Sequence, residues 1–184
     1  MENLDYRETE YERYCFDSTT LTLLIDFAME VKVENALIEF VEEKIKDIFG
    51  IEKLQVYVYH GSQEDNDIYC RLEELCQCAG ITFAKEIMTE NELYEKLCRE
   101  ICPGKNHYFY KVSSEGWISI CAKAQPGEYA VDHLLNGIDE EDAKEVEALV
   151  RKDPFLDEDC RDCHKLQNCY GGCAYEGREK FCML

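Results

Sequence analysis

The sequence has little positive charge and no long hydrophobic run. Lysine and arginine together number 20, against 40 aspartates and glutamates, so the formal net charge is -20. A protein that binds nucleic acid or an anionic membrane needs a cationic surface, because it must neutralise phosphate groups. We therefore expect no nucleic acid and no membrane as partner, and a basic peptide or protein surface would complement this chain better.

The chain also lacks the segments that direct a protein into or across a membrane. No apolar segment is long enough to span a bilayer, and the acidic N-terminus has no hydrophobic stretch of a signal peptide. A cytoplasmic location is therefore expected. Thiols stay reduced in the cytoplasm, so clustered cysteines are expected to bind metal rather than to form disulfides.

Alternating strand and helix patterns occupy the first half of the chain. Residues 1–18 show no clear period and form a lead-in. Beyond them, the apolar spacing predicts strands and helices in alternation, at 21–27, 35–49, 54–60, 65–79, 81–84 and 89–101. Thr89 and Glu92 form the capping-box pattern that opens the last helix. Three strand-helix repeats predict a parallel α/β arrangement.

A different pattern follows the third predicted helix. Two apolar segments, 108–112 and 117–121, predict a β-hairpin whose turn ends at Gly116, a position that favours glycine. Residues 139–152 then predict an acidic helix that is capped by Asp139. The second half of the chain is therefore expected to be α+β.

Twelve cysteines are the most informative feature of the sequence. The terminal group has the spacing C-x2-C-x5-C-x3-C and a later cysteine, at Cys160, Cys163, Cys169, Cys173 and Cys182. Upstream, the order is Cys102, thirteen residues, Gly116, four residues and Cys121. Spacing alone allows a closed zinc site formed by the first four terminal cysteines. That site would leave Cys102, Cys121 and Cys182 without a role.

In this order the cysteines and the glycine resemble the seven-cysteine signature of the SPASM domain. This domain is the C-terminal extension of radical S-adenosylmethionine enzymes that mature ribosomally made peptides and proteins. The resemblance covers residues 98–184 and implies two auxiliary 4Fe-4S clusters held by thiolates. It implies that the first cluster is bound by Cys102, Cys121 and Cys173. It implies that the second is bound by Cys160, Cys163, Cys169 and Cys182. Cys98 is the candidate for the missing ligand of the first cluster, since it would share a helical face with Cys102.

Residues 19–97 are similar to the later strand-helix units of the partial barrel in such enzymes. The expected fold class is thus α/β, with a boundary near residues 98–106 before a small cysteine-rich α+β domain. The loop that binds S-adenosylmethionine in this family has the pattern C-x3-C-x2-C. Cys98 and Cys102 match its start, but Lys105 stands at its third cysteine position. We therefore expect no S-adenosylmethionine site in this chain and no activity of the chain alone.

These features predict an iron-sulfur protein that serves a radical enzyme completed by another polypeptide. The chain would relay electrons or help to seat a ribosomally made peptide, either as the C-terminal portion of the enzyme or as a split subunit. A stand-alone electron carrier and a zinc-stapled interaction module are the alternatives. Cys70, Cys76 and Cys78 diverge around their helix and are expected to be buried or half-buried thiols without a ligand role.

Overall fold

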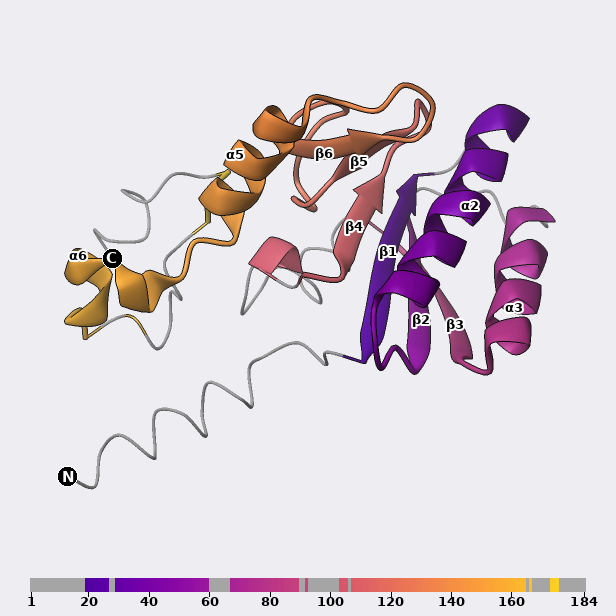
Figure 1. Ribbon diagram of the computed structural model, residues 1–184, viewed down its shortest axis with the longest axis horizontal. Coiled ribbons are helices and arrows are strands. Elements are labelled where there is room, and N and C mark those ends of the chain that lie inside the picture. The colour runs from indigo at the N-terminus through magenta and orange to yellow at the C-terminus, as the bar shows by residue number, and fades with distance from the viewer. Residues whose placement is uncertain are drawn as a thin grey trace.

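A computed structural model of the chain describes residues 19–26, 29–59, 67–89, 92, 103–105, 107–164, 166 and 173–175. The elements, in chain order, are β1 (Thr20–Asp26), α2 (Val31–Asp47), β2 (Lys53–Tyr59), α3 (Asp67–Ala79), β3 (Thr82–Met88), η1 (Pro103–Lys105), β4 (Phe109–Val112), β5 (Trp117–Ser119), β6 (Ala130–His133), α5 (Glu140–Val150), η2 (Pro154–Leu156) and α6 (Glu158–Arg161). In Figure 1, α2 and α3 lie at one end of the fold and α5 and α6 at the other. The fold is α/β.

The strands of the described residues form one mixed sheet in the order β3-β2-β1-β4-β5-β6. β1, β2, β3 and β4 are parallel, whereas β5 is antiparallel to both of its neighbours. β1 is central, because Leu23 pairs with Val56 of β2 on one side and with Tyr110 of β4 on the other. The parallel α/β arrangement that the alternating pattern predicts is confirmed for β1, α2, β2, α3 and β3.

The hydrophobic core lies between the sheet and the first two helices. Apolar residues recur on one face of each helix, so that both helices can bury that face. The buried core residues of these helices are Val33, Leu37, Phe40, Val41, Ile68, Tyr69, Leu72 and Cys76. Most of them join Leu21, Leu23 and Ile25 of β1 in one cluster. None of the described helices is both long and apolar enough to cross a membrane.

Several elements differ from the sequence prediction. α2 covers Val31–Asp47, so it begins four residues before the predicted start at residue 35. β3 continues to Met88, beyond the predicted end, because its whole length pairs with β2. β5 ends at Ser119, where a register shift interrupts its pairing with β6, so Cys121 lies in the following loop and not in the strand. β6 was not predicted, since Asp132 and His133 interrupt its short apolar pattern. Its pairing with β5 supplies the stability that the pattern does not indicate.

Two local predictions are confirmed by hydrogen bonds. The Thr89 backbone N–H donates to Glu92 Oε2 at 2.8 Å, and the Glu92 N–H donates to Thr89 Oγ1 at 3.4 Å, which is the reciprocal capping box. In the hairpin turn, the Gly116 N–H donates to the Ser113 carbonyl at 3.0 Å. Gly116 has a φ of +97°, a left-handed conformation that residues with a side chain rarely adopt.

The sheet is continuous across the predicted domain boundary near residues 98–106, because β4 pairs with β1. β1, β2 and β3 follow one another in sequential order, as strand-helix units of a barrel do, but β4 returns to the other side of β1. The order of the strands therefore reverses at β1. The division into segments 19–97 and 98–184 stays a prediction, and the lead-in 1–18 lies outside the described residues.

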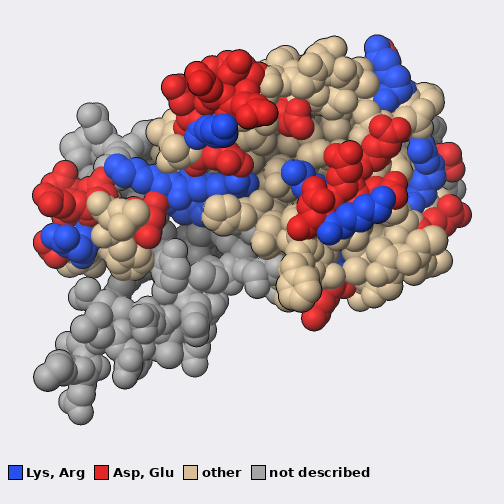
Figure 2. All heavy atoms as spheres, in the orientation of Figure 1, with Lys and Arg blue, Asp and Glu red and all other residues tan. Residues whose placement is uncertain are grey.

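α5 begins at the predicted cap. The Asp139 carboxylate accepts hydrogen bonds from the backbone N–H groups of Glu141 at 2.8 Å and Asp142 at 3.4 Å. The first turn is acidic, which suits the positive end of a helix dipole. In Figure 2 the acidic side chains near this helix form a patch, and a band of lysine and arginine side chains lies beside it. Lysine and arginine side chains thus form a local cationic group on the surface of a strongly acidic chain.

Candidate metal centre

The structure describes half of the predicted cluster ligands. Cys121 and Cys160 are buried, with exposed fractions of 4% and 8%, and Cys163 and Cys173 are half-buried. All four are thiols rather than disulfides. The remaining predicted ligands lie outside the described residues: Cys98, Cys102, Cys169 and Cys182. The surroundings of the four described thiols can therefore be compared with the two predicted ligand sets.

Tyr129 connects the segments that carry Cys121 and Cys173. Its backbone carbonyl accepts a hydrogen bond from the Ile120 N–H at 3.2 Å, directly before Cys121. Its side-chain hydroxyl donates to the Ala174 carbonyl at 3.2 Å, directly after Cys173. One residue thus ties together the chain next to two cysteines that are far apart in the sequence.

The electrostatics of Tyr129 show that both thiols are near it. Burial is the main cause that raises the pKa of the Tyr129 hydroxyl above its usual value, and the charges of Cys121 and Cys173 are the next two causes. Tyr129 also has a φ of +50°, which is uncommon for a residue with a large side chain. Backbone strain of this kind persists only where the surrounding contacts impose it, and it is concentrated at functional sites.

The loop after Cys121 is held against one face of the hairpin. Lys111 of β4 pairs with Ser119 of β5, so their side chains share a face. The Lys111 ammonium donates to the carbonyls of Ala122 at 3.2 Å and Ala124 at 2.7 Å. The Ser119 hydroxyl donates to the carbonyl of Glu128 at 2.9 Å. These bonds attach both ends of the loop to the sheet.

Gly104 brings η1 into direct contact with the same region. A Cβ placed on Gly104 would lie 2.0 Å from the Ile120 carbonyl oxygen and 2.8 Å from Val150 Cγ1. Only a residue without a side chain allows this approach. Arg151, at the end of α5, strengthens it by donating from Nε to the Gly104 carbonyl at 3.4 Å. Gly104 follows Cys102 by two positions in the sequence and packs against the residue before Cys121.

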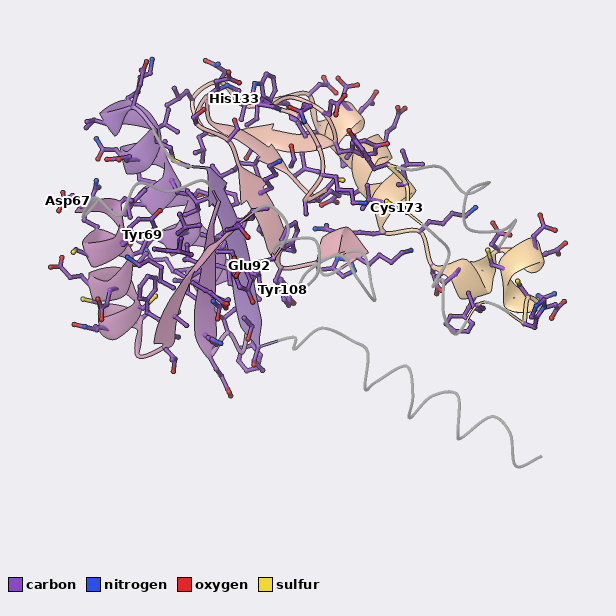
Figure 3. The ribbon with its side chains drawn as sticks, turned by 180° about the vertical axis from the view of Figure 1, so that it is seen from behind. Asp67, Tyr69, Glu92, Tyr108, His133 and Cys173 are labelled. Atoms are coloured by element: carbon purple, nitrogen blue, oxygen red, sulfur yellow. The ribbon has the colours of Figure 1, made fainter. Side chains whose placement is uncertain are left out.

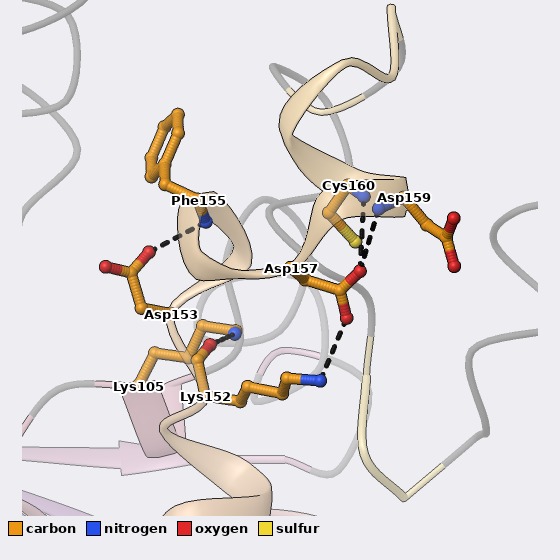
Figure 4. A network of polar contacts seen from close by, with 7 residues as sticks. All are labelled: Lys105, Lys152, Asp153, Phe155, Asp157, Asp159 and Cys160. Carbon is orange, nitrogen blue, oxygen red and sulfur yellow. Dashed lines mark hydrogen bonds and ion pairs between the residues drawn. The ribbon is translucent and has the colours of Figure 1, made fainter.

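A second polar network surrounds Cys160 (Figure 4). Asp157 caps α6, because its Oδ1 accepts from the Asp159 N–H at 3.0 Å and from the Cys160 N–H at 3.4 Å. Its Oδ2 binds the Lys152 ammonium at 2.9 Å, and the Lys152 carbonyl accepts from Lys105 Nζ at 3.1 Å. The network therefore links η1 to the short helix that carries Cys160.

Cys160 and Cys163 lie in one tight turn. The Cys163 N–H donates to the Cys160 carbonyl at 3.0 Å. The C-x2-C spacing is one that structural metal sites use. Nearby, His164 and Arg161 are exposed, and Arg161 contacts Asp162 at 3.7 Å.

The thiols of α3 have different surroundings. Cys76 is fully buried, and burial followed by the charge of Glu73 raises the pKa of its thiol to about 11. It is thus a core side chain, as predicted. Cys70 and Cys78 are exposed, so the expectation that they are buried or half-buried is wrong. Both lie on the side of α3 that faces away from the hydrophobic core, and none of the described residues covers them. Figure 3 shows Tyr69 of this helix on the opposite side of the molecule from Cys173.

The donor set fits a soft metal or an iron-sulfur cluster in its chemistry, because cysteine thiolates bind both. Among the residues that the structure describes, no three Cys, His, Asp or Glu side chains are grouped closely enough to hold a metal. Cys160, Cys163 and Cys173 are all described, so these three do not form one group. Cys121 and Cys173 adjoin Tyr129, whereas Cys160 and Cys163 share a turn.

Comparison of the chain with protein-family models, with curated proteins and with solved structures finds no match. Any functional interpretation therefore depends on the residues themselves.

The three residues that organise the site were not found from the sequence. Lys111 gave a weak signal, since a lysine among the apolar residues of a strand needs a polar partner. Gly104 and Tyr129 gave no signal in the sequence. The close backbone approach at Gly104 and the positive φ of Tyr129 depend on which segments pack together in the fold. Spacing predicts candidate ligands, whereas these residues hold the segments that carry two of the candidates, Cys121 and Cys173.

Proposed function

We propose that the chain binds two 4Fe-4S clusters through two separate sets of cysteines. Cys121 and Cys173 belong to the first set, together with Cys102 and Cys98. The second set consists of Cys160, Cys163, Cys169 and Cys182. The observation that carries this proposal is the pairing of Cys121 with Cys173 through Tyr129, which matches the ligand set that the SPASM resemblance implies.

One further contact supports the first set. Gly104, two positions after Cys102, packs against Ile120, which precedes Cys121. A chain of two residues spans at most about 7 Å, so sequence connectivity alone limits how far Cys102 can be from this contact. Gly104 is therefore the described residue that links the sequence after Cys102 to the residue before Cys121.

The zinc alternative makes a different demand on the described thiols. A zinc site of Cys160, Cys163, Cys169 and Cys173 needs three of the described thiols to converge. These three do not form a group that could hold a metal. Two separate clusters need only pairs of the described thiols. Cys121 and Cys173 both affect the pKa of Tyr129, and Cys160 and Cys163 share a turn.

The proposed role is electron relay, or peptide seating, for a radical enzyme. When bound, 4Fe-4S clusters supply one-electron transfer. The chain's own residues would position the thiolates, exclude water from the buried Cys121 and Cys160, and offset the negative charge of the ligands with lysine and arginine. Because residues 1–184 contain no C-x3-C-x2-C loop, the cleavage of S-adenosylmethionine would fall to another part of the same enzyme or to a partner polypeptide.

Metal analysis of the anaerobically purified chain tests the proposal. We expect about eight irons and eight sulfides per chain, with a brown thiolate-to-iron absorption band. Cys121→Ala and Cys173→Ala should each lower the iron content to about four, and so should Cys160→Ala and Cys163→Ala. Cys78→Ala is the matched control, because Cys78 is an exposed thiol of α3 and should leave the iron unchanged. About one zinc and a colourless protein would overturn the proposal.

Co-purification distinguishes the partner role from a stand-alone carrier. The tagged chain should retain a polypeptide that carries the C-x3-C-x2-C loop, in an anaerobic extract of the source cells. Retention of eight irons without such a polypeptide would instead favour the carrier.

A further inference from the structure

We propose that the exposed surface of α5 and η2 binds a basic amphipathic helix of a partner protein. The residues of this α5–η2 surface are Glu141, Asp142, Glu145, Leu149, Phe155 and Leu156. None of them is a candidate cluster ligand, so the inference does not rest on the proposed function.

Large apolar side chains are exposed at the C-terminal end of the α5–η2 surface. Leu149 is 57% exposed and Leu156 is 83% exposed, and Phe155 between them is 36% exposed. Single exposed leucines are ordinary in soluble proteins, whereas several exposed apolar residues close together are typical of a contact surface. The apolar end of the surface therefore offers area that a partner can bury.

The orientation of α5 directs Leu149 away from the fold. Val150 is 3% exposed and Val146 packs against the hydrophobic core, so these two residues define the inner face of the helix. Leu149 is displaced from Val150 by about 100° around the helix axis. Asp142 and Glu145 precede Leu149 by seven and four positions, so the three side chains form one outward stripe.

The acidic residues of α5 indicate the charge of the partner. Two of them pair with a lysine or an arginine four positions along the chain. No ion pair of the described residues includes Glu141, Asp142 or Glu145. Figure 2 shows the acidic side chains near this helix as a patch on the surface. Lysine or arginine of a partner would complement these carboxylates, and the net charge of -20 would attract a basic segment from a distance.

A helix is the partner element that fits this arrangement. Asp142, Glu145 and Leu149 are spaced by three and four positions, so they form a ridge along α5. A second helix packs against such a ridge with residues of its own at the same spacing. The expected partner helix has lysine or arginine opposite the acidic part of the surface and apolar residues opposite Leu149 and Leu156.

Binding of a synthetic peptide to the full chain tests the proposal. The probe is a fluorescein-labelled helix of about four turns, with leucines at i, i+3, i+4 and i+7 and lysines beside them. The control peptide has the same composition in an order that gives no apolar face. In fluorescence anisotropy at about 0.15 M salt, we expect the affinity to be about tenfold higher for the amphipathic peptide.

Serine substitutions test the apolar contacts. Leu149→Ser combined with Leu156→Ser should lower the affinity for the amphipathic peptide about tenfold. Phe49→Ser is the matched control and should leave the affinity unchanged, because Phe49 is fully exposed but follows α2 at the other end of the fold (Figure 1).

Charge reversal tests the acidic contacts. Glu141→Lys combined with Glu145→Lys should also lower the affinity about tenfold. Glu39→Lys combined with Glu43→Lys is the matched control, because these two residues are exposed on α2 and the net charge changes by the same amount. This control should lower the affinity less than about twofold. If the α5 variant fails to fold, Glu141→Gln combined with Glu145→Gln supplies the comparison.

Equal affinity for the two peptides would overturn the proposal. An equal loss of affinity in the α5 and α2 charge variants would overturn it as well, since net charge alone would then explain the binding. Sedimentation of the chain by itself examines a second copy as the occupant. A dimer that dissociates on Leu149→Ser with Leu156→Ser would assign the α5–η2 surface to that second copy and refute the basic partner. None of these outcomes depends on the iron content, so failure of the proposed function is distinguishable.

Discussion

Substitution of Gly104 by alanine should be unusually damaging for a glycine with an ordinary backbone conformation. The new Cβ would lie 2.0 Å from the Ile120 carbonyl oxygen, 2.8 Å from Val150 Cγ1 and 3.1 Å from the Ile120 carbonyl carbon. Ordinary carbon-oxygen contacts are about 3.3 Å or longer, so the overlap with the oxygen exceeds about 1 Å. Two of the three neighbours are backbone atoms, which cannot move aside by changing rotamer.

The free energy of unfolding should fall because the new Cβ displaces η1 from the end of β5. Overpacking in a closely packed region costs about 1–3 kcal/mol, and this site belongs at the upper end because backbone must shift. For a chain of this size, about 3 kcal/mol lowers the Tm by roughly 6–12 °C. Gly104 follows Cys102 by two positions in the sequence and contacts the residue before Cys121, so on the proposed function the iron content should fall as well.

Gly137→Ala is the control for this variant. Gly137 has a φ of +63°, but nothing lies within 4 Å of its Cβ position. Its substitution should cost about 1 kcal/mol, from backbone conformation alone. Thermal unfolding followed by circular dichroism gives the Tm of Gly104→Ala and of Gly137→Ala. If Gly104→Ala is no less stable than Gly137→Ala, the close approach of η1 to Ile120 is refuted.

Two further predictions concern α3. Iodoacetamide at pH 8 should alkylate the exposed Cys70 and Cys78 in the folded chain. Cys76 should react only in urea, because it is buried and its thiol pKa is about 11. Peptide mass spectrometry measures the three rates, and equal rates would contradict the burial of Cys76. Burial and Glu34 raise the pKa of Tyr69 from 10.0 to about 12, so between these pH values the folded state holds a proton that the unfolded state has lost. The free energy of unfolding should therefore fall by up to about 3 kcal/mol as pH rises through this range. Urea unfolding of Tyr69→Phe should show a shallower fall with pH. An equal fall in both proteins would refute the raised pKa of Tyr69.

Much of the α/β part could be predicted from periodicity. Leu37, Phe40 and Val41 lie on one helical face, and this spacing alone indicated a helix that packs on a sheet. The pairing of β4 with β1 could not be predicted in this way, because periodicity indicates which face of a strand is buried but not which strand lies beside it.

The prediction for the cysteines had a similar limit. Spacing indicated which thiols are available and, through the SPASM resemblance, how they would be divided. It did not indicate that Lys111 and Tyr129 hold the loops that carry them. These contacts join residues that are distant in sequence, so no local pattern records them.

The sequence by itself determined the local features: the helical faces, the capping box at Thr89 and the glycine turn at Gly116. Each of these depends on residues within a few positions of one another, where backbone geometry makes the outcome the same in many folds. Tertiary structure alone decided that the Cys121 and Cys173 segments meet at Tyr129. That meeting requires β5, the following loop and residues 173–175 to be packed together, and packing depends on residues that are distant in sequence.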